Sequence, residues 1–280
     1  MASQVVSAGD IKIGKGHPLV LIAGPCVIES FEITYDIARF VKELTDDLKI
    51  PFIFKASYDK ANRTSLSSYR GPGLKEGLSM LSEIKERLGI CVISDVHSIS
   101  EIPLAASVLD VLQIPAFLCR QTDFVVEAAR SGRPINVKKG QFLAPWDIRN
   151  VIEKISFSGN RQVVVTERGV SFGYNNLVVD FRGLAIMRSF GFPVVFDATH
   201  SVQLPGGAGS CSGGQREFAP VLARAAVAAG VDGIFMEVHS DPDCALCDGP
   251  NSLHLRDLKK LLVQLVAIHK ITGSLGTGTE

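Results

Sequence analysis

The chain has 280 residues, of which 46% are hydrophobic and 21% charged, and its 29 Lys and Arg balance its 29 Asp and Glu. This composition suits one large folded domain, residues 1–280, and excludes a disordered chain. Because the formal net charge is zero, we expect no binding of nucleic acid or of an anionic membrane through bulk charge. No apolar stretch approaches the ~18 residues that span a bilayer.

The N-terminus shows no charged leader followed by a long apolar region, so we expect no signal peptide. The six cysteines are scattered along the chain and do not resemble a disulfide framework. Together these features predict a cytoplasmic protein.

The predicted elements begin with a short hairpin within residues 1–16, where residues 5–7 and 11–13 flank a Gly9-Asp10 turn. Eight apolar runs of strand length follow, at residues 19–23, 52–54, 90–93, 111–112, 135–137, 163–165, 194–196 and 234–236. Helical spacing of apolar residues fills the intervals between them. The predicted helices lie near residues 30–44, 74–88, 101–109, 123–131, 146–156, 184–190, 218–229 and 255–266.

Strict alternation of strands and helices predicts a parallel sheet with right-handed crossovers. Continuous apolar runs are typical of parallel strands that are buried on both faces. Eight such units favour an α/β fold closed into a (β/α)8 TIM barrel, with the hairpin covering the amino end of the barrel. A Rossmann-like open sheet is the alternative, but no Gly-x-Gly-x-x-Gly opens a helix after a strand.

Each apolar run stops at or just before a polar residue that can carry chemistry. In chain order these residues are Cys26, Lys55, Asp95, Gln113, Lys138, Arg168, His200 and Glu237. In a (β/α)8 barrel the residues at the carboxyl ends of the strands line one shared active site. We therefore expect the eight strand endings to form a single pocket.

The segment 203–214, which follows the seventh strand, is rich in Gly and Ser. Such a composition predicts a mobile loop on the active face, and loops of this length are often lids. A flexible loop without a function is the alternative.

Residues 55–65 contain three cations and several hydroxyl and amide donors directly after the second strand. Lys supplies a point charge, and Arg supplies planar contacts to phosphate or carboxylate. Since Lys138, Lys139 and Arg168 end other strands, the sequence predicts an anion pocket with room for two phosphate-sized groups. The alternative is a solvated charged turn.

Four further residues form a candidate metal site, namely Cys26, His200, Glu237 and Asp248. A thiolate, an imidazole and two carboxylates can together bind a borderline divalent ion such as Zn²⁺ or Fe²⁺. Taken singly, Cys26 is more often a buried small side chain, and His200 a hydrogen-bonded core or substrate contact. All of them except Asp248 end a predicted strand, and this shared position favours the metal site. The pair Cys244 and Cys247 has Cys-x-x-Cys spacing without a second pair, and we interpret it as incidental.

Several longer motifs resemble 3-deoxy-D-manno-octulosonate 8-phosphate synthase over nearly the whole chain. They are Lys60-Ala61-Asn62-Arg63-Thr64-Ser65, Tyr69-Arg70-Gly71-Pro72-Gly73, Gln113-Ile114-Pro115-Ala116-Phe117-Leu118, Arg120-Gln121-Thr122-Asp123, Glu167-Arg168-Gly169, Phe172-Gly173-Tyr174-Asn175 and Cys247-Asp248-Gly249-Pro250. The resemblance implies a TIM-barrel transferase that condenses phosphoenolpyruvate with D-arabinose 5-phosphate and releases inorganic phosphate. Its product feeds the Kdo sugar of lipopolysaccharide, and the family is usually homotetrameric.

The resemblance also implies roles for individual residues. The phosphoenolpyruvate contacts are Lys55, Ser57, Lys60, Gln113, Lys138 and Arg168. Asn62, Arg63 and Thr64 belong to the arabinose 5-phosphate site, and Phe117 and Arg120 to a motif that reaches a neighbouring subunit's site. We assign catalytic roles to Lys60, Asp95, Lys138 and His200.

The family has metal-dependent and metal-independent members, which differ at the first strand. Cys26 stands where the metal-independent branch has asparagine, so the resemblance implies a divalent metal, Zn, Fe or Mn, on Cys26, His200, Glu237 and Asp248. In contrast, Cys247-Asp248-Gly249-Pro250 resembles the metal-independent members, which leaves a weakly metal-requiring enzyme as an alternative.

Two other functions remain open at this point. One is 3-deoxy-D-arabino-heptulosonate 7-phosphate synthase, which uses erythrose 4-phosphate and has a Lys-Pro-Arg-Thr-Ser type motif. The other is a non-catalytic barrel that binds phosphosugars.

Overall fold

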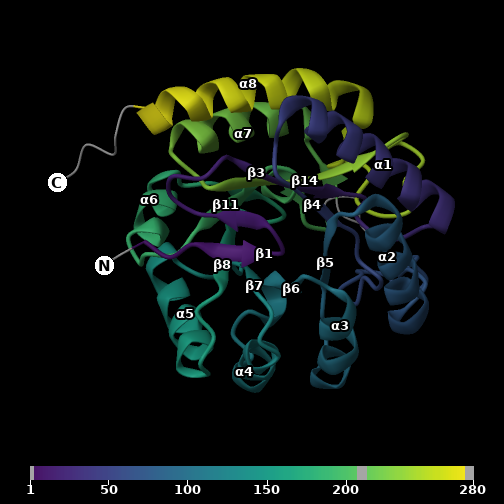
Figure 1. Cartoon of the computed structure of the whole chain (residues 1–280), viewed down its shortest axis with the longest axis horizontal. Coiled ribbons are helices and arrows are strands. Elements are labelled where there is room, and N and C mark those ends of the chain that lie inside the picture. Colours follow the sequence, from purple (N-terminus) through teal and green to yellow (C-terminus); the bar gives the residue numbers. More distant parts are fainter. Residues whose placement is uncertain (1–2, 207–212, 275–280) are drawn as a thin grey trace.

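The computed structural model describes residues 3–206 and 213–274 and shows a closed barrel of eight parallel strands (Figure 1). The strands are β3 (Val20–Gly24), β4 (Phe52–Lys55), β5 (Cys91–Asp95), β6 (Val111–Ile114), β7 (Ile135–Lys138), β8 (Val163–Glu167), β11 (Val194–Asp197) and β14 (Gly233–His239). They pair in chain order, and β14 closes the barrel by pairing with both β3 and β11. The predicted (β/α)8 barrel is confirmed.

The barrel strands are buried almost throughout, as their continuous apolar runs predict. A ring of eight helices surrounds them (Figure 1). These are α1 (Phe31–Leu48), α2 (Leu74–Leu88), α3 (Ile102–Val108), α4 (Thr122–Arg130), α5 (Ile148–Phe157), α6 (Arg182–Arg188), α7 (Ala219–Ala228) and α8 (Leu255–Ser274). Short 3₁₀ turns directly precede α3, α5 and α7.

Helix α1 illustrates how the sequence sets the limits of a helix. Ser30 caps its N-terminus, because the Ser30 side chain accepts a hydrogen bond from the backbone N–H of Ile33. Its buried face includes Ile37, Val41 and Leu44 at helical spacing. The helix ends at Lys49, which adopts a left-handed conformation.

The N-terminal hairpin, β1 (Val6–Ala8) and β2 (Ile11–Ile13), pairs antiparallel and covers one end of the barrel. Its buried side chains pack against the inward-facing residues of the strands, which lie toward the amino ends and the middle of the barrel. These residues are Val20, Ile22, Ile53, Ile93, Val111, Val164, Val195 and Phe235. In Figure 1 the hairpin lies across the centre of the ring of helices. The hairpin therefore closes the amino end and leaves the carboxyl end for ligands.

Two small sheets and one added strand lie on the carboxyl side of the barrel. The strands β9 (Val170–Ser171) and β10 (Leu177–Val178) form one hairpin, and β15 (Leu253–His254) extends β14. The strands β12 (Gln203–Leu204) and β13 (Gly213–Gly214) pair antiparallel at the base of the predicted loop 203–214. Residues 207–212 of that loop lie outside the described residues, so its predicted mobility stays a prediction.

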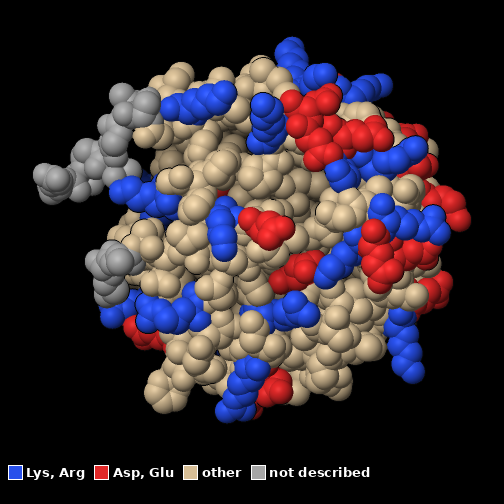
Figure 2. Space-filling view, viewed as in Figure 1, with Lys and Arg blue, Asp and Glu red and all other residues tan. Residues whose placement is uncertain are grey.

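Charged side chains of both signs are distributed over the surface. Figure 2 shows Lys and Arg scattered among Asp and Glu on the face that carries the hairpin, rather than gathered in one field. None of the helices within residues 3–206 and 213–274 has the length and apolarity that crossing a bilayer requires. The described cysteines, Cys26, Cys91, Cys119, Cys244 and Cys247, are free thiols.

Candidate active site

A cavity of about 350 Å³ opens at the carboxyl end of the barrel. Residues from the ends or following loops of every barrel strand except β3 line it. Of the predicted strand endings, Lys55, Asp95, Gln113, Lys138, Arg168 and His200 line the cavity, as do Lys60, Asn62, Arg63, Thr64, Phe117 and Asp248. A volume of this size is typical of a small-molecule site.

The predicted residues outside the cavity wall lie close to it. Ser57, Cys26 and Glu237 are buried beneath the wall and contact residues that line it. Arg120 lies on the wall of an adjoining hollow, which shares His97 with the main cavity.

Close approach of β3 and β4 beneath the cavity requires glycine at position 24. A Cβ atom there would lie 2.0 Å from the backbone oxygen of Lys55. This approach lets the Lys55 ammonium donate hydrogen bonds to the backbone oxygen of Cys26, at 2.8 Å, and to Glu237 Oε1, at 3.1 Å. Burial alone raises the pKa of Glu237, but His200, Lys55 and the nearby Lys60 outweigh it and lower that pKa to about 2.

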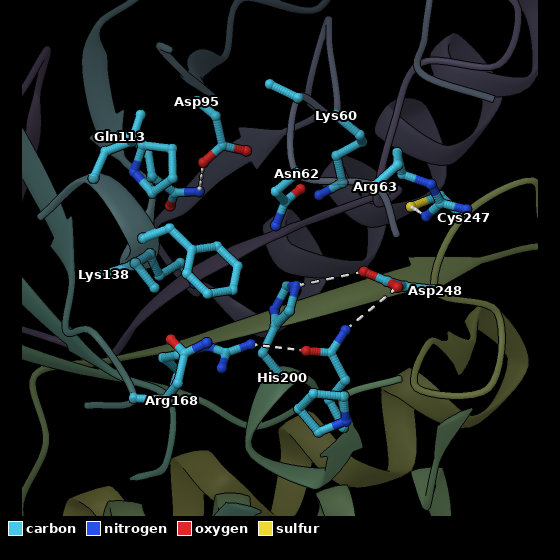
Figure 3. A pocket seen from close by; sticks show the side chains of 18 of the residues that line it. Lys60, Asn62, Arg63, Asp95, Gln113, Lys138, Arg168, His200, Cys247 and Asp248 are labelled. Carbon is cyan, nitrogen blue, oxygen red and sulfur yellow. Dashed lines mark hydrogen bonds and ion pairs between the residues drawn. The ribbon is translucent and has the colours of Figure 1, made fainter. Parts of the chain in front are cut away.

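Two guanidinium groups at the cavity keep buried N–H donors without a protein partner. Nε of Arg63 and Nη1 of Arg168 are both in this state, and Figure 3 shows the two side chains on opposite sides of the pocket. Burial lowers the pKa of Arg168. A buried donor without a partner costs about 1–3 kcal/mol, and an anionic ligand removes that cost.

Lys138 and His200 share one carboxylate, that of Asp197. The Lys138 ammonium forms an ion pair with Asp197 Oδ2, which also lies 2.7 Å from His200 Nδ1. Burial lowers the pKa of Lys138 to about 8, although Asp197 opposes the shift. Because Asp197 holds Nδ1 of His200, the other ring nitrogen faces Glu237 and Asp248.

A chain of hydrogen bonds runs through the barrel interior below the cavity. Asp95 accepts bonds from Ser57 Oγ at 2.6 Å and from Gln113 Nε2 at 2.7 Å. Gln113 Oε1 accepts a bond from Asn136 Nδ2 at 2.8 Å, and Asn136 Oδ1 accepts one from Thr166 Oγ1 at 2.6 Å. Burial raises the pKa of Asp95, but the opposing charges of Lys55, Lys60 and His97 outweigh it and hold that pKa well below its usual range. The chain fixes the carboxylate and amide groups that face the cavity.

His97, which also lines the cavity, is held by a second polar group. The Glu101 carboxylate accepts hydrogen bonds from the Tyr58 hydroxyl at 2.8 Å and from the His97 backbone N–H at 2.9 Å. Burial opposes ionisation of Glu101, but the contacts with His97 and Tyr58 lower its pKa to about 2.

Asp248 lies close to Cys26 on one side and belongs to a second group with His200 and Glu237. Cys26 Sγ is 3.4 Å from Asp248 Oδ2, and His200 Nε2 is 3.5 Å from Glu237 Oε1 and 3.8 Å from Asp248 Oδ2. A tetrahedral ion with bonds of ~2.1–2.3 Å separates its ligand atoms by ~3.4–3.8 Å. Glu237 Oε2 is buried without a hydrogen-bond partner. The spacing and the unpartnered oxygen therefore fit a divalent metal.

Gln203, at the start of β12, links the anion site to the candidate metal site. Its Oε1 accepts a hydrogen bond from Arg168 Nη2 at 2.9 Å, and its Nε2 donates one to Asp248 Oδ1 at 3.4 Å. Figure 3 shows this link as dashed lines between the labelled Arg168 and Asp248.

Sequence reasoning missed Asp197, Asn136 and Cys247. A signal for Asp197 was its place directly after an apolar run, and for Asn136 its place inside one. Cys247, which we interpreted as incidental, lies with its Sγ 2.9 Å from Cys26 Sγ. Its partner in the Cys-x-x-Cys spacing, Cys244, is exposed, so the contact follows from the fold and not from the spacing.

Comparison with known proteins agrees with this geometry. The chain is 64% identical over 269 residues to the 2-dehydro-3-deoxyphosphooctonate aldolase of Trichlorobacter lovleyi, a match that covers 96% of this chain and 99% of the relative. The enzyme of the same name from Geobacter metallireducens is 65% identical, with the same coverage. That from Pelobacter propionicus is 63% identical over 271 residues, 97% of this chain and 99% of the relative.

The name of these relatives is another name for 3-deoxy-D-manno-octulosonate 8-phosphate synthase, so the resemblance inferred from the motifs is confirmed. The model of the DAHP synthetase I family matches residues 2–273. The chain therefore belongs to the DAHP synthetase I family, with 2-dehydro-3-deoxyphosphooctonate aldolases among its relatives.

Proposed function

We propose that this protein condenses phosphoenolpyruvate with D-arabinose 5-phosphate and water to give 3-deoxy-D-manno-octulosonate 8-phosphate and inorganic phosphate. The observation that carries the proposal is the pair of unpartnered guanidinium donors, on Arg63 and Arg168, at opposite sides of one cavity. Two substrates that each carry a phosphate need two such anion sites. The names of the relatives favour the eight-carbon product over the seven-carbon one.

Phosphoenolpyruvate occupies the side of Arg168 in this proposal. Lys60, Lys138 and Arg168 all line the cavity and match the charge of a phosphate and a carboxylate. Their fixed positions orient the enol carbon toward the second substrate, and such positioning lowers the barrier of a two-substrate reaction. Gln113, fixed by the chain of hydrogen bonds to Asp95 and Asn136, supplies a neutral polar contact.

The pentose phosphate occupies the side of Arg63. Arg63, Asn62 and Thr64 lie on the loop after β4, and all three line the cavity. This loop is less buried than the wall beneath it, so its side chains can close on the phosphate of the sugar after it enters. The aldehyde then lies toward the centre of the cavity.

The proposed bond forms between C3 of phosphoenolpyruvate and the aldehyde carbon, while water adds at C2. The phosphorylated hemiketal then loses phosphate by C–O cleavage. Negative charge develops on the aldehyde oxygen, and a proton donor or cation aimed at that oxygen stabilises the transition state. We assign proton movement at this oxygen to His200, which Asp197 holds in one ring orientation. Lys138, whose pKa burial lowers to about 8, balances charge beside it.

The residues Cys26, His200, Glu237 and Asp248 would hold a divalent metal. Such an ion can polarise an oxygen of the aldehyde or lower the pKa of a bound water. Sulfur and nitrogen donors together suit Zn²⁺ and Fe²⁺, and Mn²⁺ remains a candidate through the two carboxylates.

Phosphate release measured with two aldehydes, each with and without EDTA, tests the proposal. Turnover with arabinose 5-phosphate and none with erythrose 4-phosphate is expected. Turnover with erythrose 4-phosphate alone would identify the seven-carbon synthase, and binding of both sugar phosphates without product would identify a non-catalytic barrel.

Inhibition by the chelator should depend on Cys26. The variant Cys26→Asn removes the thiolate, and we expect EDTA to inhibit it less than the wild-type enzyme. Equal inhibition of both proteins would exclude Cys26 as a ligand.

We also propose that the enzyme is a cytoplasmic homotetramer. Free thiols at Cys26 and Cys247 suit a reducing compartment. Phe117 and Tyr174 are exposed aromatic side chains, at 55% and 97%, and aromatic residues are enriched at protein interfaces. Sedimentation equilibrium tests the assembly, and a mass of a single chain at micromolar concentration would contradict it.

A further inference from the structure

Two buried thiols from distant parts of the sequence meet beside the candidate metal site. Cys26 follows β3, and Cys247 lies in the segment between β14 and β15. Their Sγ atoms are 2.9 Å apart, and the two side chains are only 4% and 3% exposed. Val27 and Tyr69 pack around them. Both sulfurs are therefore held together away from bulk solvent.

Asp248 joins the two thiols to the predicted ligands. The donor atoms of Cys26, Cys247 and Asp248 lie within 4.8 Å of one another, and so do those of His200, Glu237 and Asp248. One carboxylate thus belongs to two potential ligand groups. Cys247 lies in the same group as the predicted ligand Cys26, and Asp248 joins that group to His200 and Glu237.

Local contacts hold Cys247 and Asp248 in this position. The Glu29 carboxylate accepts a hydrogen bond from the backbone N–H of Leu246 at 2.8 Å, which ties the segment to the loop after β3. Asp248 has a φ of 48°, a conformation that is costly for a residue with a side chain. A Cβ atom on Gly249 would lie 2.3 Å from the backbone oxygen of Pro242, so the following turn requires glycine. Such strain is often kept at functional sites.

Arg63 fixes the position of the Cys247 sulfur. Arg63 Nη1 donates a hydrogen bond to Cys247 Sγ at 2.7 Å, and Figure 3 shows these two labelled side chains next to each other. Hydrogen bonds to a ligating sulfur are a common support of metal sites. The carboxylates of Glu237 and Asp248 lie beside the two sulfurs, and a divalent ion bound there would offset their negative charge.

We propose that Cys247 is a second sulfur ligand of the metal, so that the centre draws on Cys26, Cys247, His200, Glu237 and Asp248. This inference rests on the metal dependence in the proposed function. Two sulfur ligands favour Zn²⁺ or Fe²⁺ over Mn²⁺, and zinc sites with an open position expand from four to five ligands. The motif Cys247-Asp248-Gly249-Pro250, which resembles metal-independent members, then strengthens the site instead of weakening it.

The number of sulfur ligands can be counted on the unsubstituted protein. X-ray absorption of the zinc-loaded full chain resolves sulfur neighbours at ~2.3 Å from nitrogen and oxygen neighbours at ~2.0–2.2 Å. Two sulfurs for each bound zinc are expected. One sulfur would overturn the proposal, because Cys26 alone accounts for it.

Cobalt replacement identifies which thiol is bound. In the Co²⁺-loaded enzyme, the thiolate-to-cobalt absorption should fall to about half in Cys247→Ser and by the same amount in Cys26→Ser, since each variant removes one of two sulfur ligands. Cys244→Ser is the matched control, because Cys244 is exposed and only three positions away, and its spectrum should equal that of the wild type. A thiolate-to-cobalt absorption in Cys247→Ser as strong as that of the wild type would overturn the proposal.

Metal affinity alone does not separate a ligand from a neighbour, because loss of an outer contact also weakens binding about 10–100-fold. Titration of the free thiols in the metal-free protein gives a third test, because it shows whether Cys26 and Cys247 form a disulfide. A Cys26–Cys247 disulfide that persists after incubation with a thiol reductant and Zn²⁺ would overturn the proposal.

Failure of this inference is distinct from failure of the proposed function. Product formation by a protein that binds no metal would leave the synthase activity standing and remove the ligand assignment. Two zinc-bound sulfurs in a protein without turnover would support the ligand assignment and contradict the synthase activity.

Discussion

Lys138 is a buried cation whose charge depends on pH near neutrality. Its ammonium lies 3.0 Å from the centroid of the Phe235 ring and forms an ion pair with Asp197. Burial favours the neutral amine, and Lys55 adds to that effect, while Asp197 and Asp95 oppose it. The net result is a pKa of about 8, so Lys138 loses its proton as the pH rises through this value.

We therefore expect kcat/KM for phosphoenolpyruvate to fall as the pH rises above about 8. The protonated amine binds the anion, and the neutral amine does not. In Lys138→Arg the charge persists to higher pH, so the falling limb should move upward even if the rate is lower. In Lys138→Met kcat/KM should fall ~10²–10³-fold at every pH. Initial rates between pH 6 and 10 measure these effects.

A falling limb at the same pH in wild type and Lys138→Arg would assign the titration to another group. Equal rates for Lys138→Met and wild type would remove Lys138 from the site.

At the residue scale, the sequence could predict the residues that end strands but not all their partners. Lys138 and Arg168 follow short apolar runs, and this position alone predicted their place on the cavity wall. The contact between Cys26 and Cys247 spans 221 positions, and no local pattern encodes it. Asp197 was hidden because His200, three residues later, is the more distinctive side chain.

Among the elements, the N-terminal hairpin affects the stability of the fold more than the rate of catalysis. Ile13 on β2 is 1% exposed and packs against the strand interior, away from the cavity that the carboxyl ends form. Ile13→Ala should lower the free energy of unfolding by ~2–5 kcal/mol and leave kcat unchanged for the folded enzyme. Urea denaturation and initial rates measure the two effects.

Lys12→Ala is the matched control, because Lys12 is exposed on the same strand; its effect should stay within ~0.5 kcal/mol. A loss of kcat in Ile13→Ala without loss of stability would contradict this separation of the two barrel ends.

The chain of hydrogen bonds links neighbouring strands from β5 to β8. Thr166→Val keeps the shape of the side chain but removes the donor to Asn136 Oδ1. An unpaired buried acceptor costs ~1–3 kcal/mol, and urea denaturation should show a loss of this size. No loss would mean that Asn136 finds another donor when Thr166 is replaced.

The elements themselves were largely predictable. All eight strand runs became barrel strands, because an apolar run bounded by polar residues fits a strand that is buried on both faces. Strand ends were less predictable. β14 extends to His239, three residues past the predicted run, because its later residues pair with β3 and β15.

For the whole molecule, ligand binding and folding are linked. The cavity draws on loops from all but one of the barrel strands, so phosphoenolpyruvate binds the closed barrel and not the unfolded chain. At ~100 times its Kd it should stabilise the fold by ~2.7 kcal/mol, which raises Tm by ~5–10 °C for a chain of this size. Differential scanning calorimetry measures the shift.

Lys138→Met should lose most of this rise in Tm, measured against the variant's own unliganded Tm. A rise of the same size with inorganic sulfate at the same concentration would show that the cavity does not discriminate between anions.

The closed barrel was predictable from the count and order of the units, whereas the site was predictable only in part. Sequence indicates which residues stand at strand ends, and closure brings these ends together. It does not indicate the rotation of each side chain, and that rotation decides whether Glu237 faces Lys55, His200 or the cavity.

The hydrogen-bond chain below the cavity also limits how the enzyme can be re-engineered. Gln113 and Asn136 each donate to one neighbour and accept from the other, in a chain that spans four strands. A replacement at either position leaves a complementary group on the next strand without a partner. Directed evolution toward other aldehydes should therefore succeed with paired libraries at Gln113 and Asn136 and stall with single-site ones.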